Sequence, residues 1–296
     1  MTQTYDVTNS ADSGAGSLRE AISLANANPG KDDIFIGADV ELSSSIDITD
    51  SVDIGTNFGA KILQTGADRI FNIDDGRAEE NIDVSLYRLT LTGGNSDSVG
   101  GAILSQEDLT ITDSQISENI SLYKGGGIYQ AGGSIYIERS QILANEAATA
   151  EDNELSAGGG IYLLNSLYDF QGSIFRDNES VVGEGVYVLN STGQLASNNE
   201  LDDSLFTVSI PAAPDAALSL EKVDSPANQN FEAQNLDNLK SYLSFGSDYS
   251  LPISVLNIMN LNASVTDLNA PSLEKELVLG SEAENDPMTT ACCPDV

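Results

Sequence analysis

The sequence predicts an all-β fold, a parallel β-helix solenoid, on two observations. The first is a recurring glycine corner, which reads GGAIL, GGGIY, GGGIY and GEGVY at positions beginning with Gly100, Gly125, Gly158 and Gly183. The second is that short stretches of alternating apolar and polar residues separate the corners. A fixed period with short strands between turns is typical of repeats that stack on one another.

The period is close to 25 residues, because the steps between corners are 25, 33 and 25. We attribute the long step to an acidic insertion at about residues 147–155. A second element keeps the same phase, since segments 109–119, 135–145 and 168–178 align with one another. The aligned segments share a serine at one position and an asparagine at another, namely Ser114, Ser140, Ser173, Asn119, Asn145 and Asn178.

Each corner residue has a structural explanation. Glycine reaches positive φ and lets neighbouring backbones approach closely, so we expect it at a sharp turn of each coil. Asparagine tolerates the left-handed conformation, and its amide can bond along the stack, so we expect it at a second corner. In Ile46-Asp47-Ile48 the apolar side chains should face the core and the carboxylate should face solvent.

The two ends of the chain differ from the repeats. Residues 17–20 read SLRE, a capping box, and an apolar face follows, so a helix is expected over 17–27. Asn28-Pro29-Gly30 should end it. We therefore divide the chain into an N-terminal cap at 1–33, a parallel β-helix at 34–205, a C-terminal capping or packing segment at 206–281 and a disordered acidic tail at 282–296.

The C-terminal segment lacks the repeat but contains a strongly apolar part at 231–268. Such a surface is expected to be covered. We expect it to dock on its own β-helix, which would leave a monomer, with burial against a partner chain as the alternative.

These motifs resemble a known family. DSGAGSLREAI at 12–22, followed by ANANPG at 25–30 and the GGGIY coils, is similar to right-handed parallel β-helix proteins with an N-terminal CSLREA domain, a pectin-lyase-like fold. Gly16 stands where that motif has cysteine. The resemblance covers about residues 5–205 and implies a bacterial surface or extracellular, adhesin-like protein. It carries no catalytic motif to this chain.

Composition excludes several functions. The formal net charge of −34 disfavours nucleic acid as a partner. The absence of histidine excludes imidazole catalysis and histidine metal ligands, and the absence of tryptophan removes the strongest stacking platform. No apolar run is long enough for a membrane span, and no signal peptide is visible. Cys292 and Cys293 are adjacent and cannot form a disulfide framework.

Two sets of residues are candidate sites. Tyr129, Tyr162 and Tyr187 each follow an inward residue of a corner, so they should form an outward column. This column is a candidate surface for sugar or protein, but we favour the alternative that the apolar C-terminal segment covers it. Asp74 and Asp75 are candidate ligands for calcium, the one cofactor that the acidic composition suggests. Arg139 and Arg176 lie near acidic residues but not in one ladder.

We therefore expect a non-catalytic extracellular or cell-surface protein used for adhesion, binding or assembly, with a protein or polysaccharide on an outer face. The first alternative is a polysaccharide lyase or hydrolase that acts on an acidic glycan, which would need convergent carboxylates or a basic residue beside calcium. The second is an intracellular, cytoplasmic scaffold.

Overall fold

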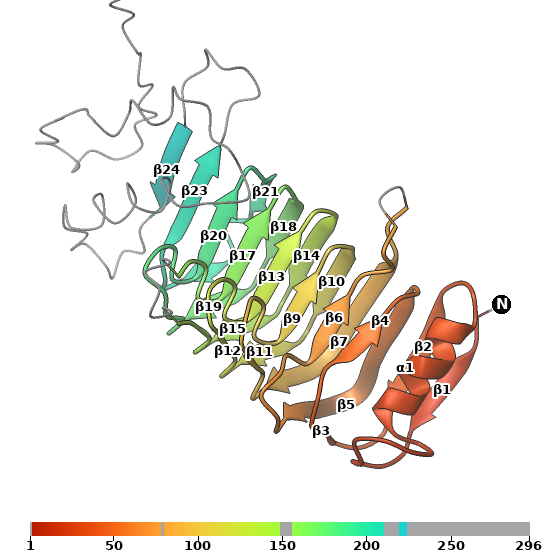
Figure 1. Cartoon of the computed structure of the whole chain (residues 1–296). Helices are drawn as coiled ribbons and strands as arrows, with labels where there is room; N and C mark the ends of the chain where they lie inside the picture. Colours follow the sequence, from red (N-terminus) through yellow and green to blue (C-terminus); the bar gives the residue numbers. More distant parts are fainter. Residues whose placement is uncertain (1, 78–79, 149–155, 210–218, 224–296) are drawn as a thin grey trace, which may run out of the picture.

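A computed structural model describes residues 2–77, 80–148, 156–209 and 219–223 of the chain. This part consists mostly of strands, with one helix, α1 (Leu18–Ala27), and its strands pair almost entirely in parallel. Successive turns of the chain stack from α1 at one end to β23 and β24 at the other (Figure 1). The arrangement is compatible with the predicted all-β parallel solenoid.

The largest sheet curls around the body because two long strands, β5 (Val52–Gln64) and β7 (Asp83–Thr92), pass through a corner without a break. The first part of β7 pairs with β10 and the last part with β11, whereas later coils divide these parts into separate strands. The other strands of this sheet are β1 (Thr4–Val7), β2 (Asp32–Ile36), β3 (Val40–Leu42), β10 (Asp108–Thr112), β11 (Gln115–Ser117), β14 (Ser134–Glu138), β15 (Gln141–Leu143), β18 (Leu167–Gln171), β19 (Ile174–Arg176), β21 (Thr192–Leu195) and β22 (Glu200–Leu201).

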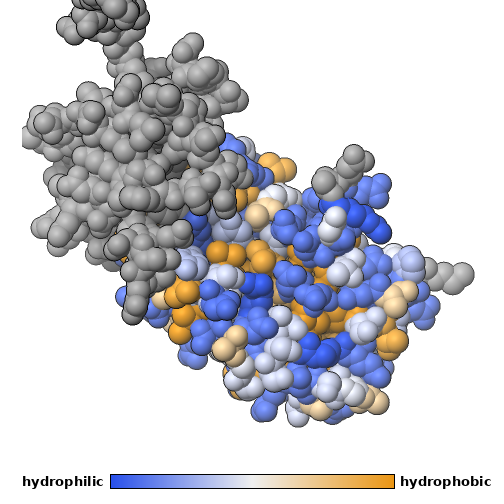
Figure 2. All heavy atoms as spheres, viewed as in Figure 1, coloured by the Kyte–Doolittle hydropathy of each residue, from blue (hydrophilic) through white to orange (hydrophobic). Residues whose placement is uncertain are grey.

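A second sheet and a short third one complete the coils. The second contains β4 (Ile46–Ile48), β6 (Phe71–Ile73), β9 (Ile103–Ser105), β13 (Ile128–Ala131), β17 (Ile161–Leu164), β20 (Val186–Leu189), β23 (Leu205–Ser209) and β24 (Ser219–Val223). The third contains β8 (Asn95–Ser96), β12 (Ile120–Ser121) and β16 (Glu146–Ala147). On the face shown in Figure 2, hydrophilic residues predominate and hydrophobic ones show between them.

The core consists of ladders of inward apolar side chains, one from each coil. Along the second sheet, each member pairs in register with the next, and all are at most 5% exposed: Ile46, Phe71, Ile103, Ile128, Ile161, Val186 and Leu205. Asp47 lies on the opposite side of its strand and is exposed, as the alternation predicts. Burying each large apolar side chain contributes roughly 1.5–3 kcal/mol, so the ladders supply the main stabilisation.

The glycine corners have the predicted geometry. Gly100, Gly125, Gly158 and Gly183 have φ values of 67°, 65°, 65° and 62°. The glycines that follow are needed for close stacking, since a Cβ on Gly127 would lie 2.7 Å from the carbonyl oxygen of Gly160 in the next coil. Both parts of the glycine prediction are confirmed.

The asparagine prediction is half right. The amides do bond along the stack, because Asn119 donates to Asn145 at 2.9 Å and Asn145 donates to Asn178 at 3.0 Å. The left-handed conformation, however, belongs to the residue before each asparagine, namely Glu118, Ala144 and Asp177. The asparagine itself turns inward, where its amide meets buried backbone groups that solvent does not reach.

Helix α1 closes one end of the stack, as predicted. The Ser17 side chain accepts a hydrogen bond from the Glu20 amide at 3.2 Å, and the Glu20 carboxylate accepts one from the Gly16 amide at 2.6 Å. The apolar face is buried and contacts β1, β2 and β4; its members are Leu18, Ala21, Ile22 and Ala25. The helix ends at Ala27, with Asn28 as its C-cap.

At the other end, β24 pairs with β23 in antiparallel register, so one short segment beyond residue 205 lies against the last coil. The expectations for residues 231–268, for the tail at 282–296 and for Cys292 and Cys293 fall outside the described residues. Most of the insertion at 147–155 does as well. The strands on either side of that insertion nevertheless stay in register, since Ile128 pairs with Ile161.

Candidate functional site

The three predicted tyrosines form a column. Tyr129, Tyr162 and Tyr187 pair in register, and their rings stack with centroids 5.1 and 5.0 Å apart and interplanar angles of 8° and 12°. The Lys124 ammonium lies 5.6 Å from the centroid of the Tyr162 ring, within reach of a cation–π interaction.

This column is covered over much of its length. Tyr162 and Tyr187 are 2% and 1% exposed, and they pack in a cluster with Ala157 and Val182. Burial raises the pKa of Tyr187. Two of the three rings are therefore inaccessible to a ligand in this structure.

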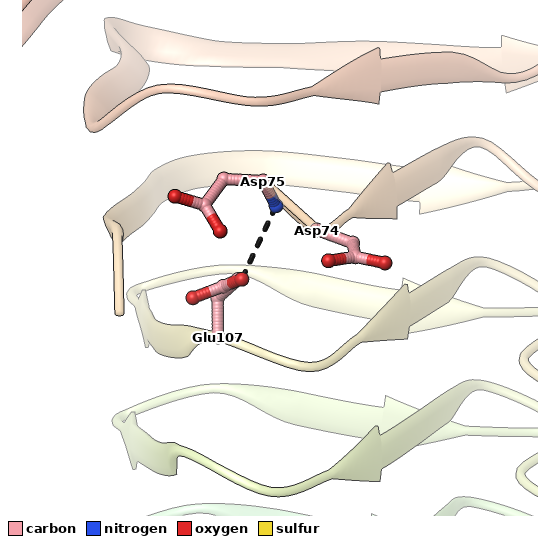
Figure 3. Close-up of side chains that lie close together, drawn as sticks. All are labelled: Asp74, Asp75 and Glu107. Carbon is pink, nitrogen blue, oxygen red and sulfur yellow. Dashed lines mark hydrogen bonds between the residues drawn. The ribbon is translucent and has the colours of Figure 1, made fainter. Parts of the chain in front are cut away.

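The predicted metal ligands lie in a carboxylate cluster. Asp74 and Asp75 follow β6, and Glu107 comes from the next coil, with their oxygens within 4.8 Å of one another (Figure 3). Burial raises the pKa of Glu107, which is 2% exposed. An all-oxygen set of this kind is what calcium prefers.

The cluster also has a structural role. Glu107 accepts hydrogen bonds from the amides of Asp75 at 3.2 Å and Ile82 at 3.0 Å, one on each oxygen. Gly76 and Arg77 donate their amides to Asp74 and Asp75. These bonds hold the loop after β6 against the following coil, and calcium binding here stays a prediction.

A third site was not expected from the sequence. An open groove of about 500 Å³ lies where a loop within β5 faces the corners that follow the first part of β7, β10 and β14. It is lined by Asn57, Phe58, Gly59, Arg88, Leu89, Thr90, Asp113, Ser114, Gln115, Arg139 and Gln141. Its size falls in the range of small-molecule sites, and most of its lining side chains are polar.

The loop on one side of the groove is held in place by its neighbours. The register between β5 and β7 shifts between Gly55 and Ala60, so residues 56–59 form a bulge. Arg88 donates to the Asn57 carbonyl oxygen at 3.2 Å. The Phe58 ring packs edge-on against Phe35, with centroids 6.3 Å apart and an angle of 80°. Phe58 nevertheless remains 65% exposed.

The floor of the groove is a polar ladder. Thr90 pairs with Gln115, and Gln115 with Gln141, so these outward side chains follow one another at about the strand spacing of 4.8 Å. Gln141 is exposed, and its side-chain amide has no hydrogen-bond partner in the described part of the chain.

The arginines that the sequence singled out are engaged in ion pairs. Arg139 contacts Asp113 at 2.8 Å and also Glu138, and Arg176 contacts Asp202 at 2.6 Å and also Glu200. The hydrogen bonds from Arg139 hold the pKa of Asp113 below its usual range. Of the side chains that line the groove, Asp113 is the one carboxylate, and it is already paired.

Sequence signals for these missed residues exist. Gly55 and Gly59 flank Thr56-Asn57-Phe58 and interrupt the alternation of the strand, which indicates a bulge. Glu107 lies two residues after the inward Ser105, so alternation would have placed it inward too.

No helix in the described residues is long and apolar enough to cross a membrane. Comparison of the chain with protein-family models, curated proteins and solved structures found no significant match.

Proposed function

We propose that the chain is a non-catalytic binding protein built on a right-handed parallel β-helix of the CSLREA type, and that it acts outside the cell or at the cell surface. The handedness, the family and the location rest on the motifs at 12–30 and on the glycine corners. The partner is a protein or polysaccharide held on the outer face of the coils.

The main support for the proposal is that the carboxyl groups with a raised pKa are buried and hydrogen-bonded to the backbone. Glycoside hydrolysis needs two carboxyl groups that face one cleft, one of them an acid with a raised pKa. In the described residues the raised carboxyl pKa values belong to Glu107 and Asp203, which are 2% and 7% exposed. Both accept backbone N–H bonds inside the stack, so they suit a structural role better than proton transfer to a substrate.

The lyase alternative also finds little support. A lyase needs a base near a cation that neutralises the uronate. Among the described residues, the carboxylates of Asp74, Asp75 and Glu107 come closest to such a cation site. The basic residue beside them is Arg77, whose guanidinium lies 3.6 Å from the Asp75 carboxylate. Arginine stays protonated and is a poor base.

The test is to incubate the full chain with uronate polymers and neutral polysaccharides, with and without calcium, and to follow both binding and product release. We expect retention of a polymer or of a surface protein without unsaturated or reducing ends. Release of such ends at enzymatic rates would overturn the proposal. Cell fractionation of the source organism distinguishes surface location from the scaffold alternative.

A further inference from the structure

We propose that the groove beside the β5 bulge binds an uncharged oligosaccharide, with Phe58 as the stacking platform and Gln141 as a principal hydrogen-bonding side chain. This inference rests on the proposed binding function and assigns it a site and a ligand class.

The aromatic side of the groove is preorganised. Phe58 is 65% exposed, yet its position is fixed by Phe35 and by the loop that Arg88 holds. The Phe58 amide also donates to the buried Thr56 hydroxyl at 3.4 Å. A rigid exposed ring offers an apolar face for the C–H groups of a sugar and loses little conformational entropy when it binds.

The polar side suits hydroxyl groups. A sugar hydroxyl both donates and accepts, and so does a glutamine amide. Gln115 uses its amide nitrogen to donate to Ser117 at 2.8 Å, whereas the Gln141 amide is free within the described structure. The ladder of Thr90, Gln115 and Gln141 repeats at a spacing comparable with the length of one sugar unit.

The net charge of the protein disfavours an anionic ligand, and the two arginines that line the groove disfavour a cationic one. The chain has a formal net charge of −34, so a polyanion would be repelled before it reached the groove. Inside the groove, Asp113 is paired with Arg139, and Arg88 binds the Asn57 carbonyl oxygen. The guanidinium groups of Arg88 and Arg139 would therefore act on a ligand in the groove mainly as planar hydrogen-bond donors to its hydroxyl oxygens.

The experiment measures binding of the full chain to cello-, xylo-, manno- and maltohexaose by calorimetry, with Phe58→Ala and Gln141→Ala as test variants. Leu167→Ala is the matched control, because Leu167 is 61% exposed on β18 and does not line the groove. Circular dichroism and thermal unfolding confirm that each variant is folded.

We expect at least one of these sugars to bind the parent chain. Phe58→Ala should weaken that binding about tenfold, the effect of losing one aromatic contact. Gln141→Ala should weaken it severalfold, and Leu167→Ala should leave it unchanged. Failure of all four sugars to bind, or equal binding by Phe58→Ala, overturns the groove assignment. If the protein instead retains another polymer or a protein equally with and without Phe58, the binding function stands and this site alone is wrong.

Discussion

At the scale of single residues, the interior of the stack is organised by a directional amide ladder. Asn119, Asn145 and Asn178 each donate to the side chain of the following coil, and Asp203 accepts from Asn178 at 2.7 Å. A carboxylate can only accept, so it ends the series. Each amide also bonds a buried backbone group, as Asn145 does with the Ile116 carbonyl oxygen at 2.9 Å.

Replacing the middle amide should be costly. Asn145→Ala removes the acceptor of the Asn119 backbone N–H and the donor to the Ile116 carbonyl oxygen, and both of these groups stay buried. We expect a loss of about 3 kcal/mol or more in the free energy of unfolding, measured with denaturant. Asn72→Ala is the control, since Asn72 makes one amide bond to Asp47 on the outside of the stack and should cost less than about 1 kcal/mol. Equal losses would contradict the ladder's importance.

The terminal carboxylate makes stability depend on pH. Burial raises the pKa of Asp203 above its usual value. The folded state therefore binds the proton more tightly than the unfolded state, so this group's favourable contribution is complete at low pH and is lost as pH rises through the folded pKa.

Asp203→Asn removes that titration and keeps an acceptor for Asn178. The variant should gain stability over the parent as pH rises from 4 to 7, reaching on the order of 1 kcal/mol. Thermal unfolding at several pH values measures the difference. A difference that does not change with pH would show that Asp203 does not carry this effect.

At the scale of elements, the corner glycines meet two requirements, a positive φ and the lack of a Cβ that would collide with the backbone. A matched pair of variants can separate these requirements. Gly158 and Gly30 both have positive φ, at 65° and 105°. A Cβ on Gly158 would collide with the backbone of Ile161, whereas a Cβ on Gly30 would meet nothing within 4 Å.

Gly30→Ala should therefore cost about 1–3 kcal/mol from backbone strain alone. Gly158→Ala adds a collision in the stack, and we expect it to cost clearly more or to prevent folding. The unfolding midpoint in denaturant and the yield of folded protein measure both. If the two variants were equally stable, the corner could widen without a further decrease in the free energy of unfolding.

The elements set by local sequence were predictable, and the site was not. Helix α1 follows from Ser17 and Glu20, which lie within one turn, and the coils follow from a repeat visible along the chain. The groove depends on the β5 bulge lying beside corners that come some 30 to 80 residues later, and on which charges pair there. The column at Tyr162 was predicted from alternation, but its burial depends on packing against Ala157, Val182 and the adjacent rings of the column, which alternation alone does not show.

At the scale of the whole molecule, the two ends of the stack are protected differently. Helix α1 covers the first end, and β24 pairs with the exposed edge of β23 at the last. An uncovered strand edge tends to pair with another chain.

Proline at both Leu220 and Glu221 should release that edge, because one of two adjacent residues in an antiparallel pair directs its N–H to the partner strand. We expect the full-length double variant to self-associate as concentration rises, measured by light scattering after size exclusion. The double alanine variant keeps both N–H groups and should behave as the parent chain. A proline variant indistinguishable from the alanine variant would show that β24 does not shield the edge.

The 33-residue step has a consequence for engineering. On the two sides of this step the described residues keep their register, since Lys124 bridges Ala157 and Ile128 pairs with Ile161. The eight additional residues of this step therefore do not change the pairing of the coils, and lengthening a loop further adds closure entropy only slowly. This position is therefore a suitable insertion site for a foreign epitope or a small folded domain, because the other coils of the scaffold would need no redesign.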